Sequence, residues 1–326
     1  LLKARSFSRS SLSCAGGLSS CLNHGPRWSA AETSMIGLDE LDCLDYLIWL
    51  RTGDRVAKRL NMDQASVSRK ARRAVAAFGL EVKKSAGEWD VEGDLSLLNL
   101  ERQVHQDCRW KRDLPLRIDA QYYSGPLLLK QPPHGWLCGA FDFLDVATPL
   151  SLLRQGVVDV WIAGYPDVPD DDDDDFAVVH LDRLPTHLVV SPGHPLTRLG
   201  DAITLEDVHQ FPALALPDGA FPKCQAALEG LGLWNSASAV RRYSYDAWEG
   251  RTDDEVTVAY ASAFSIGLYP TEKVILPIEI PLTVGDSLVV PRRFAEHPRF
   301  LALVAHLRER LVEMAPAYPE LEILPA

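Results

Sequence analysis

The most constraining feature of the sequence is the stretch DRVAKRLNMDQASVSRKARRAVAAF at residues 54–78, which predicts two helices joined by a tight turn. Val56, Ala57 and Leu60 recur at helical spacing, and the segment Asn61-Met62-Asp63 interrupts that pattern. Asp63 is a favoured helix N-cap, so a second helix is predicted to start behind it. Its inner positions are apolar: Ala65, Val67, Ala71, Ala74 and Val75. A short helix, a three-residue turn and a longer helix are typical of a helix-turn-helix.

The outer side of this second helix is polar and basic. Arg and Gln form paired hydrogen bonds with base edges, whereas Ser, Lys and Arg hold phosphates. A solvated basic helix is the plainer interpretation, but the short helix and the turn in front of it favour insertion into the major groove of double-stranded DNA. The predicted DNA-binding residues are Gln64, Ser66, Ser68, Arg69, Lys70, Arg72 and Arg73.

The charge is unevenly distributed along the chain. The net charge is −12, yet residues 51–84 contain ten Lys or Arg and three acidic residues. A basic module on an acidic body is typical of a protein that binds DNA at one end. The chain has no run of 18 apolar residues, so we expect a cytoplasmic protein without a membrane contact. Its six cysteines lack CxxC spacing, which favours reduced thiols over a Cys138–Cys224 redox pair.

The sequence also predicts a domain organisation. Residues 1–34 are rich in Ser and Arg, and we expect a disordered N-terminal extension. Residues 35–92 are predicted to form a winged helix-turn-helix, with a first helix at 38–50 and the turn of the wing near Ala86-Gly87. A linker helix is expected within residues 93–113. Its apolar side would pack either on a partner copy or on its own domain.

Beyond Pro115, strands alternate with helices, which predicts an α/β domain at residues 114–326 with a mostly parallel sheet. Thr252-Asp253-Asp254-Glu255 is typical of a capping box and predicts a helix through Ala261, and FSIGLYP (264–270) predicts a strand. Six consecutive aspartates end at Asp175. Without interleaved glycine or fixed spacing, they favour a solvated loop over a calcium site, so no metal is predicted.

Several segments resemble the LysR-type transcriptional regulators. Asp63-Gln64-Ala65-Ser66-Val67-Ser68-Arg69-Lys70 is similar to the SQPALSRQ recognition helix of that family, and LLRQGVVDVWIAG (152–164) and LVVSPGHPL (188–196) also match in order. The resemblance covers nearly everything from Ile36 onward. It implies a winged helix-turn-helix, a linker helix and an effector domain of the type 2 periplasmic-binding-protein fold, with subdomain I at about 114–188 and 268–326 and subdomain II at about 189–267. The linker (94–112) and the segment 124–135 are shorter than is usual in the family.

The resemblance further implies a small-molecule effector, a homodimer or homotetramer, and RNA polymerase as an additional partner. The effector-binding positions that it implies are Gln121, Tyr122, Ser124, Asp145, Gly164 and Thr252. Hydroxyls at helix N-termini are suited to anions, so we expect Ser124 and Thr252 to anchor a small polar or anionic metabolite from opposite subdomains. Plain helix capping is the commoner role of such residues. No cofactor is predicted.

Catalysis is the rival class of function. The sequence contains no GxSxG, HExxH or phosphate-loop motif and no GxGxxG behind a strand, so we predict that the protein is not an enzyme. A solute-binding protein or an enzyme of the periplasmic-binding fold is the alternative, and the basic module disfavours it. The predicted function is that of a sequence-specific DNA-binding transcriptional regulator controlled by a small-molecule effector.

Overall fold

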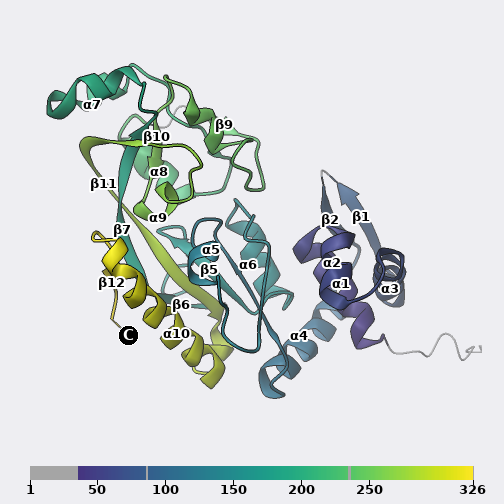
Figure 1. The fold of residues 1–326 in the computed structure, drawn as a ribbon. Coiled ribbons are helices and arrows are strands. Elements are labelled where there is room, and N and C mark those ends of the chain that lie inside the picture. Colours follow the sequence, from purple (N-terminus) through teal and green to yellow (C-terminus); the bar gives the residue numbers. More distant parts are fainter. Residues whose placement is uncertain (1–35, 86, 234–235, 326) are drawn as a thin grey trace, which may run out of the picture. The chain divides into compact units, whose positions relative to one another are not determined.

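The computed structural model describes residues 36–85, 87–233 and 236–325, and its helices and strands are labelled in Figure 1. The extension predicted for residues 1–34 lies outside the described residues. From Gly37 onward, the chain forms one compact unit. Within the described residues, no helix combines the length and the apolar character needed to cross a membrane.

Three helices and a hairpin make up the basic module. They are α1 (Leu38–Leu50), α2 (Gly53–Leu60), α3 (Gln64–Ala77), β1 (Glu81–Ser85) and β2 (Glu88–Glu92). Thr52 caps α2 and Asp63 caps α3; their side-chain oxygens accept the backbone N–H groups of Arg55 (3.3 Å) and Ser66 (2.8 Å). The antiparallel pair β1–β2 is the predicted wing.

The packing of α3 explains why one of its faces stays free. Its buried side is formed by small residues, among them Val67, Ala71 and Ala74. The helix packs on α1, whose buried side includes Leu41 and Leu44. Small residues at a helix contact allow the two backbones to approach closely, so this buried side holds α3 against α1. The opposite side of α3 is left to the solvent.

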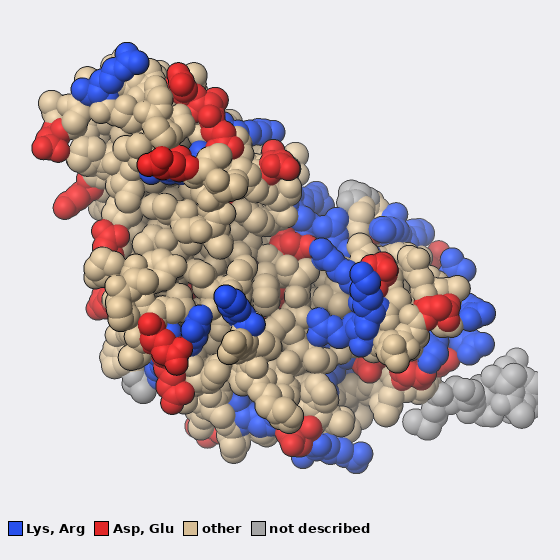
Figure 2. All heavy atoms as spheres, viewed as in Figure 1, with Lys and Arg blue, Asp and Glu red and all other residues tan. Residues whose placement is uncertain are grey.

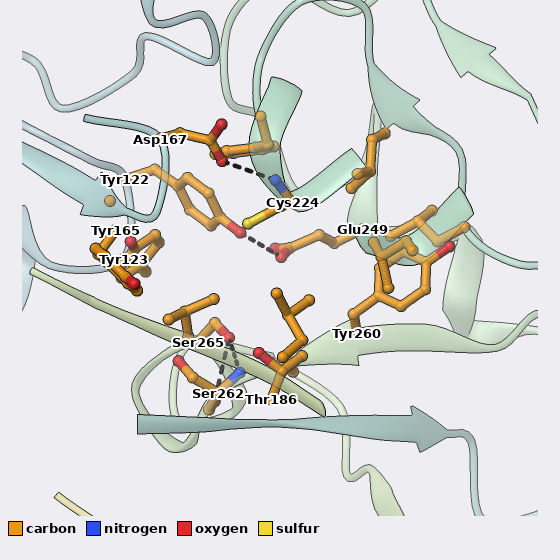
Figure 3. A pocket seen from close by; sticks show the side chains of 18 of the residues that line it. Tyr122, Tyr123, Tyr165, Asp167, Thr186, Cys224, Glu249, Tyr260, Ser262 and Ser265 are labelled. Carbon is orange, nitrogen blue, oxygen red and sulfur yellow. Dashed lines mark hydrogen bonds between the residues drawn. The ribbon is translucent and has the colours of Figure 1, made fainter. Parts of the chain in front are cut away.

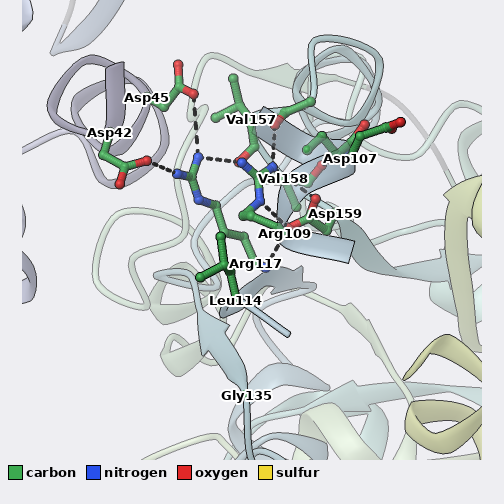
Figure 4. A network of polar contacts seen from close by, with 12 residues as sticks. Asp42, Asp45, Asp107, Arg109, Leu114, Arg117, Gly135, Val157, Val158 and Asp159 are labelled. Atoms are coloured by element: carbon green, nitrogen blue, oxygen red, sulfur yellow. Dashed lines mark hydrogen bonds and ion pairs between the residues drawn. The ribbon is translucent and has the colours of Figure 1, made fainter. Parts of the chain in front are cut away.

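Helix α4 (Ser96–Lys111) follows the wing and carries buried charges (Figure 4). Arg109 donates from Nε and Nη2 to both carboxylate oxygens of Asp159, each at 2.9 Å. Asp159 also accepts the backbone N–H of Arg117 at 2.8 Å. Arg102 in α4 donates to Asp45 of α1 at 2.8 Å. These pairs join α4 to α1 and to the start of the α/β domain.

A mixed sheet organises the α/β domain. Its central order is β10-β7-β11-β5-β3-β4, with β6 paired to β11 and β12 to β7. The strands are β3 (Leu116–Ala120), β4 (Trp136–Cys138), β5 (Val160–Tyr165), β6 (Phe176–His180), β7 (Asp182–Val190), β10 (Ala259–Ala261), β11 (Val274–Pro291) and β12 (Glu322–Ile323). The parallel pairs within this sheet, as far as the structure describes it, are those of β3 with β4 and β5. The expectation of a mostly parallel sheet is wrong, because the long strand β11 runs antiparallel to β5, β6 and β7.

Two hydrophobic cores define two lobes. The first surrounds β3 and β5 and includes α10, and the second surrounds the far ends of β7 and β11. The strands β7 and β11 pass from one lobe into the other (Figure 1). The helices are α5 (Gly125–Leu128), α6 (Ala147–Arg154), α7 (Leu205–Val208), α8 (Pro222–Gly230), α9 (Ala263–Ile266) and α10 (Pro298–Met314), and a small parallel pair is formed by β8 (Leu216–Pro217) and β9 (Ala237–Ser238).

Two local predictions in the second lobe are wrong. The helix expected from Thr252 through Ala261 does not form: Thr252 lies in a 3-10 turn over Glu249–Asp253, where its hydroxyl donates back to the carbonyl oxygen of Glu249 at 2.7 Å, and Ala259–Ala261 form strand β10. The segment 264–270 begins as helix α9 rather than as a strand, because Ser262 and Ser265 form a reciprocal cap at its start. Between Ser124 and Gly135 only α5 is helical, in agreement with the shortened segment.

The Arg109–Asp159 pair provides a test of how this framework is held together. Arg109→Ala should lower the free energy of unfolding by about 3–5 kcal/mol, because it leaves a fully buried carboxylate without its counter-charge. Lys111→Ala on the same helix removes a solvent-exposed pair with Asp107 and should have little effect. Urea unfolding followed by circular dichroism measures both variants. Equal losses in the two would contradict this account.

Candidate functional site

The outer face of α3 presents the residues predicted to bind DNA. Gln64, Arg69, Arg72 and Arg73 are exposed, whereas Ser66, Ser68 and Lys70 are half-buried. Lys and Arg side chains gather over the helix-turn-helix in Figure 2, in agreement with the basic segment of the sequence. A helix with such a face has the composition that a major groove accepts.

Contacts within the protein hold some of these side chains. Arg69 donates to the Ser66 hydroxyl at 2.9 Å, and Ser66 in turn donates to Asp63 at 2.6 Å. Lys70 pairs with Asp39, and Arg73 lies 3.6 Å from Glu40. Surface pairs are weak because water screens them, so a phosphate can replace the acidic partner at little cost.

A cavity lies between the two lobes of the α/β domain (Figure 3). It offers about 100 Å³ of free space and is mainly apolar and aromatic. Cavities of such character, with a few polar groups, are the usual binding sites for small molecules. Its lining includes the polar and aromatic residues Tyr122, Asp167, Thr186, Cys224, Glu249 and Tyr260.

One buried carboxylate of the cavity wall is held by two tyrosine hydroxyls. Tyr122, which follows β3, donates to Oε1 of Glu249 at 2.8 Å, and Tyr243 donates to Oε2 at 2.7 Å. The rings of Tyr122 and Tyr243 stack with centroids 4.0 Å apart. Burial raises the pKa of Glu249, and the hydroxyl donors offset part of that rise.

A second carboxylate occupies the start of α8. Asp167, in the loop behind β5, accepts the backbone N–H of Lys223 at 2.5 Å and that of Cys224 at 3.3 Å. Burial raises the pKa of Asp167, while these N–H donors lower it in part. The free N–H groups of a helix N-terminus, which normally attract anions, are therefore already satisfied by the chain itself.

The predicted effector-binding residues are scattered. Tyr122 and Gly164 line the cavity, whereas Gln121, Ser124, Asp145 and Thr252 do not. Asp145 accepts the Thr148 N–H at 2.5 Å, and thus caps the first turn of α6. Ser124 and Thr252 do not line this cavity, so their expected convergence on one cleft stays a prediction. The polar residues that do face the cavity, Asp167 and Glu249, were not singled out, because the sequence gives no local signal for them.

Ser124 lies instead beside a buried carboxyl pair on the two strands that connect the lobes. The backbone N–H of Asp286 in β11 donates to Asp182 in β7 at 3.2 Å. Burial raises the pKa of Asp182 to about 7, and burial together with the neighbouring Asp182 raises that of Asp286 well above its usual range. Two neighbouring buried carboxyl groups do not both ionise readily, so burial and mutual repulsion favour the protonated form of this pair.

The thiols of Cys138 and Cys224 are both free. Burial raises the pKa of Cys138 to about 11 and that of Cys224 higher still. A raised pKa keeps a thiol protonated, which makes it a poor nucleophile at neutral pH. The arrangement favours the reduced thiols expected from the sequence over the redox pair.

Together, a winged helix-turn-helix and a two-lobed α/β domain with an internal cavity define the class of DNA-binding regulators that sense small molecules. Residues 141–312, a little over half of the chain, match the family model of the LysR substrate binding domain. The chain belongs to the LysR family of transcriptional regulators, as the resemblance predicted. No curated protein matches the sequence significantly.

Solved structures show the same fold at low sequence identity. A full-length OxyR variant from Pseudomonas aeruginosa is 18% identical with a TM-score of 0.52, over 84% of this chain and 95% of that one. Full-length CbnR, crystallised in complex with its target DNA, is 15% identical with a TM-score of 0.50, over 84% of this chain and 99% of that one. These similarities support the fold; at such low identity they do not assign functions to individual residues.

Asp119, near the carboxyl end of β3, is a buried acid with an unusual titration. Its carboxylate accepts the indole N–H of Trp49 at 2.5 Å and the backbone N–H of Ala120 at 2.9 Å. Burial raises the pKa of Asp119 to about 7, although these hydrogen bonds lower it in part. The folded protein therefore keeps a proton that an unfolded chain releases near pH 4.

This titration predicts a pH dependence of stability. As the pH rises from about 4 to about 7, the raised pKa makes the folded state lose stability relative to the unfolded state, because only the unfolded state gives up its proton freely. Asp119→Asn removes the ionisable group, so its stability should not fall over this pH range as that of the wild type does, a difference on the order of a few kcal/mol. Thermal unfolding across the pH series tests this, with exposed Asp201→Asn as the control. Parallel curves for wild type and Asp119→Asn would disprove it.

Proposed function

We propose that this LysR-family regulator reads double-stranded DNA with the outer face of α3. The observation that carries the proposal is the division of this helix into a buried side of small apolar residues and a polar side on which Gln64, Arg69, Arg72 and Arg73 are exposed. Gln64 and Ser66, in the first turn, would reach base edges. The four basic residues behind them would hold phosphates: Arg69, Lys70, Arg72 and Arg73.

A second copy of the chain is the proposed partner. Leu97, Leu100 and Val104 are 62%, 58% and 57% exposed on α4, at spacings of three and four residues. An apolar stripe with this spacing favours pairing with another helix. Pairing through α4 would give a homodimer, which presents two recognition helices to two half-sites of an operator. A homotetramer and contact with RNA polymerase remain predictions from the family.

The cavity between the lobes is the proposed effector site. Its walls come from both lobes, and the lobes are connected by β7 and β11. A ligand that changes how far the lobes close would move β3, and α4 would move with it, because Asp159 is bound by Arg109 of α4 and by the backbone of Arg117 in β3. A change there would reach the proposed dimer contact and the spacing of the recognition helices.

The role of α3 can be tested by the salt dependence of DNA binding. Each phosphate contact contributes about 0.9 to the slope of log K against log salt concentration, so Arg69→Ala combined with Arg72→Ala should weaken binding and reduce the slope by about two units. Arg310→Ala removes a half-exposed arginine from α10 and serves as the matched control. Fluorescence anisotropy with labelled genomic fragments gives both quantities. An unchanged slope in the double variant would refute the assignment.

A further inference from the structure

The charges around the cavity constrain what can enter it; this inference rests on the proposed role of the cavity as the effector site. Among the described residues that line it, none is Lys, Arg or His. Two carboxylate residues do line it, Asp167 and Glu249, and they are 3% and 2% exposed. Buried acidic groups in a wall without a cation disfavour the entry of an anion.

Two lysine side chains on segments around the cavity are engaged elsewhere. Lys223 donates from Nζ to the carbonyl oxygen of Val168 at 3.0 Å and to Asp170 at 2.8 Å. Lys273 donates from Nζ to the carbonyl oxygen of Thr252 and to Asp253, both at 2.8 Å. The charge of Lys273 lowers the pKa of Glu249, although by less than the hydrogen bonds from the tyrosine hydroxyls do. The two groups that its ammonium group binds, the Thr252 carbonyl and Asp253, do not line the cavity. Neither lysine therefore presents a free ammonium group to a negatively charged ligand.

The N-terminus of α8, whose free N–H groups could bind an anion, is occupied by Asp167. Asp167 accepts the N–H groups at the start of α8, where a ligand carboxylate would otherwise bind. The predicted anchors Ser124 and Thr252 lie outside the lining. The expectation of an anionic metabolite therefore finds no support in the geometry of this cavity.

Aromatic rings surround the remaining space. Tyr122 and Tyr260 lie on opposite sides of Glu249 in Figure 3, and Trp248, Phe221 and Tyr123 complete the wall. The faces of aromatic rings attract cations, most strongly where water is excluded, and aromatic cages are a known arrangement for binding quaternary ammonium groups. The cavity combines aromatic rings with a buried carboxylate, and both attract a cation.

A polar atom without a partner supplies a further contact. The hydroxyl of Thr186, in β7, is buried, lines the cavity and has no hydrogen-bond partner among the described residues. Leaving a buried hydroxyl unpaired is unfavourable, and because a hydroxyl both donates and accepts, an N–H, an O–H or an oxygen atom of a ligand would satisfy it. The unpaired hydroxyl therefore points to a ligand that carries a polar group beside its apolar part.

We propose that the cavity binds a small organic cation, an amine or ammonium compound, with Glu249 as its counter-charge and the aromatic rings around its apolar part. The free space of about 100 Å³ limits the part of the ligand that it holds to a group smaller than a benzene ring, such as a trimethylammonium group, since an apolar cavity of about 150 Å³ holds benzene. Binding brings a positive charge to a buried carboxylate that now has hydroxyl donors at its oxygens.

Three probes of one shape and different charge test the proposal on the full chain. They are choline, its neutral isostere 3,3-dimethylbutan-1-ol, and 3,3-dimethylbutanoate. Isothermal titration calorimetry and thermal shift should show that choline binds at least about tenfold more tightly than the alcohol, since a desolvated cation–aromatic contact contributes about that factor. The carboxylate should not bind measurably. This ranking requires no variant, so it does not depend on the folding of a mutant.

A variant then assigns the preference to one residue. Glu249→Gln keeps the shape and a hydrogen-bond acceptor but removes the charge, so it should reduce the advantage of choline over the alcohol to the part that the aromatic rings supply, and leave the affinity for the alcohol within about twofold. The control is Glu255→Gln, the same chemical change at an exposed residue outside the lining. Circular dichroism verifies that both variants are folded.

The outcomes separate this inference from the proposed function. If the alcohol or the carboxylate binds as tightly as choline, the cation preference is wrong while the cavity remains a ligand site. If none of the three probes binds, the proposal for this size of ligand is overturned. DNA binding by α3 is measured independently by anisotropy, so a failure of the cavity proposal leaves that result unaffected.

Discussion

The fold depends on the buried carboxylate of Asp159 and the guanidinium groups around it. Arg109 binds both of its oxygens, and the side chain of Arg117 extends to the carbonyl oxygen of Val157 at 3.0 Å and to Asp42 of α1 at 2.5 Å. Burying charge is unfavourable unless each charge has a partner, so these groups stabilise only one arrangement of the helices and the sheet. The network thus fixes α1 and α4 against β3 through specific geometry, in addition to the apolar packing around Trp110.

The separation of charge along the chain has a second consequence inside the α/β domain. The basic residues serve the outer face of α3, while the acidic residues of the body also occupy interior positions, such as Asp167 and Glu249. Hydrogen-bond donors stabilise each of these buried carboxylates. Backbone N–H groups bind Asp167, and tyrosine hydroxyls bind Glu249. These two interior acidic residues give the cavity its negative character.

How far the sequence predicts this molecule depends on the range of the interactions involved. The helices α1, α2 and α3 were predictable because apolar spacing and the caps at Thr52 and Asp63 are local signals. The direction of β11 was not, because its pairing with β5 and β7 is decided between segments that are far apart in the chain. The capping-box pattern at Thr252 failed because its hydroxyl satisfies a carbonyl group within a single 3-10 turn.

The acidic residues of the cavity, Asp167 and Glu249, were not predicted for the same reason. The sequence therefore indicated neither the position of the cavity nor its negative charge. Glu249 becomes a site residue only when Tyr122, 127 positions earlier, donates to it. Asp167 does so only when the start of α8, 56 positions later, supplies its N–H groups. Both contacts join segments that lie far apart in the chain, and together they set the charge of the cavity wall. A ligand that loosens either contact must replace a donor on a carboxylate, which a cationic or hydrogen-bond-donating molecule can do and an anion cannot.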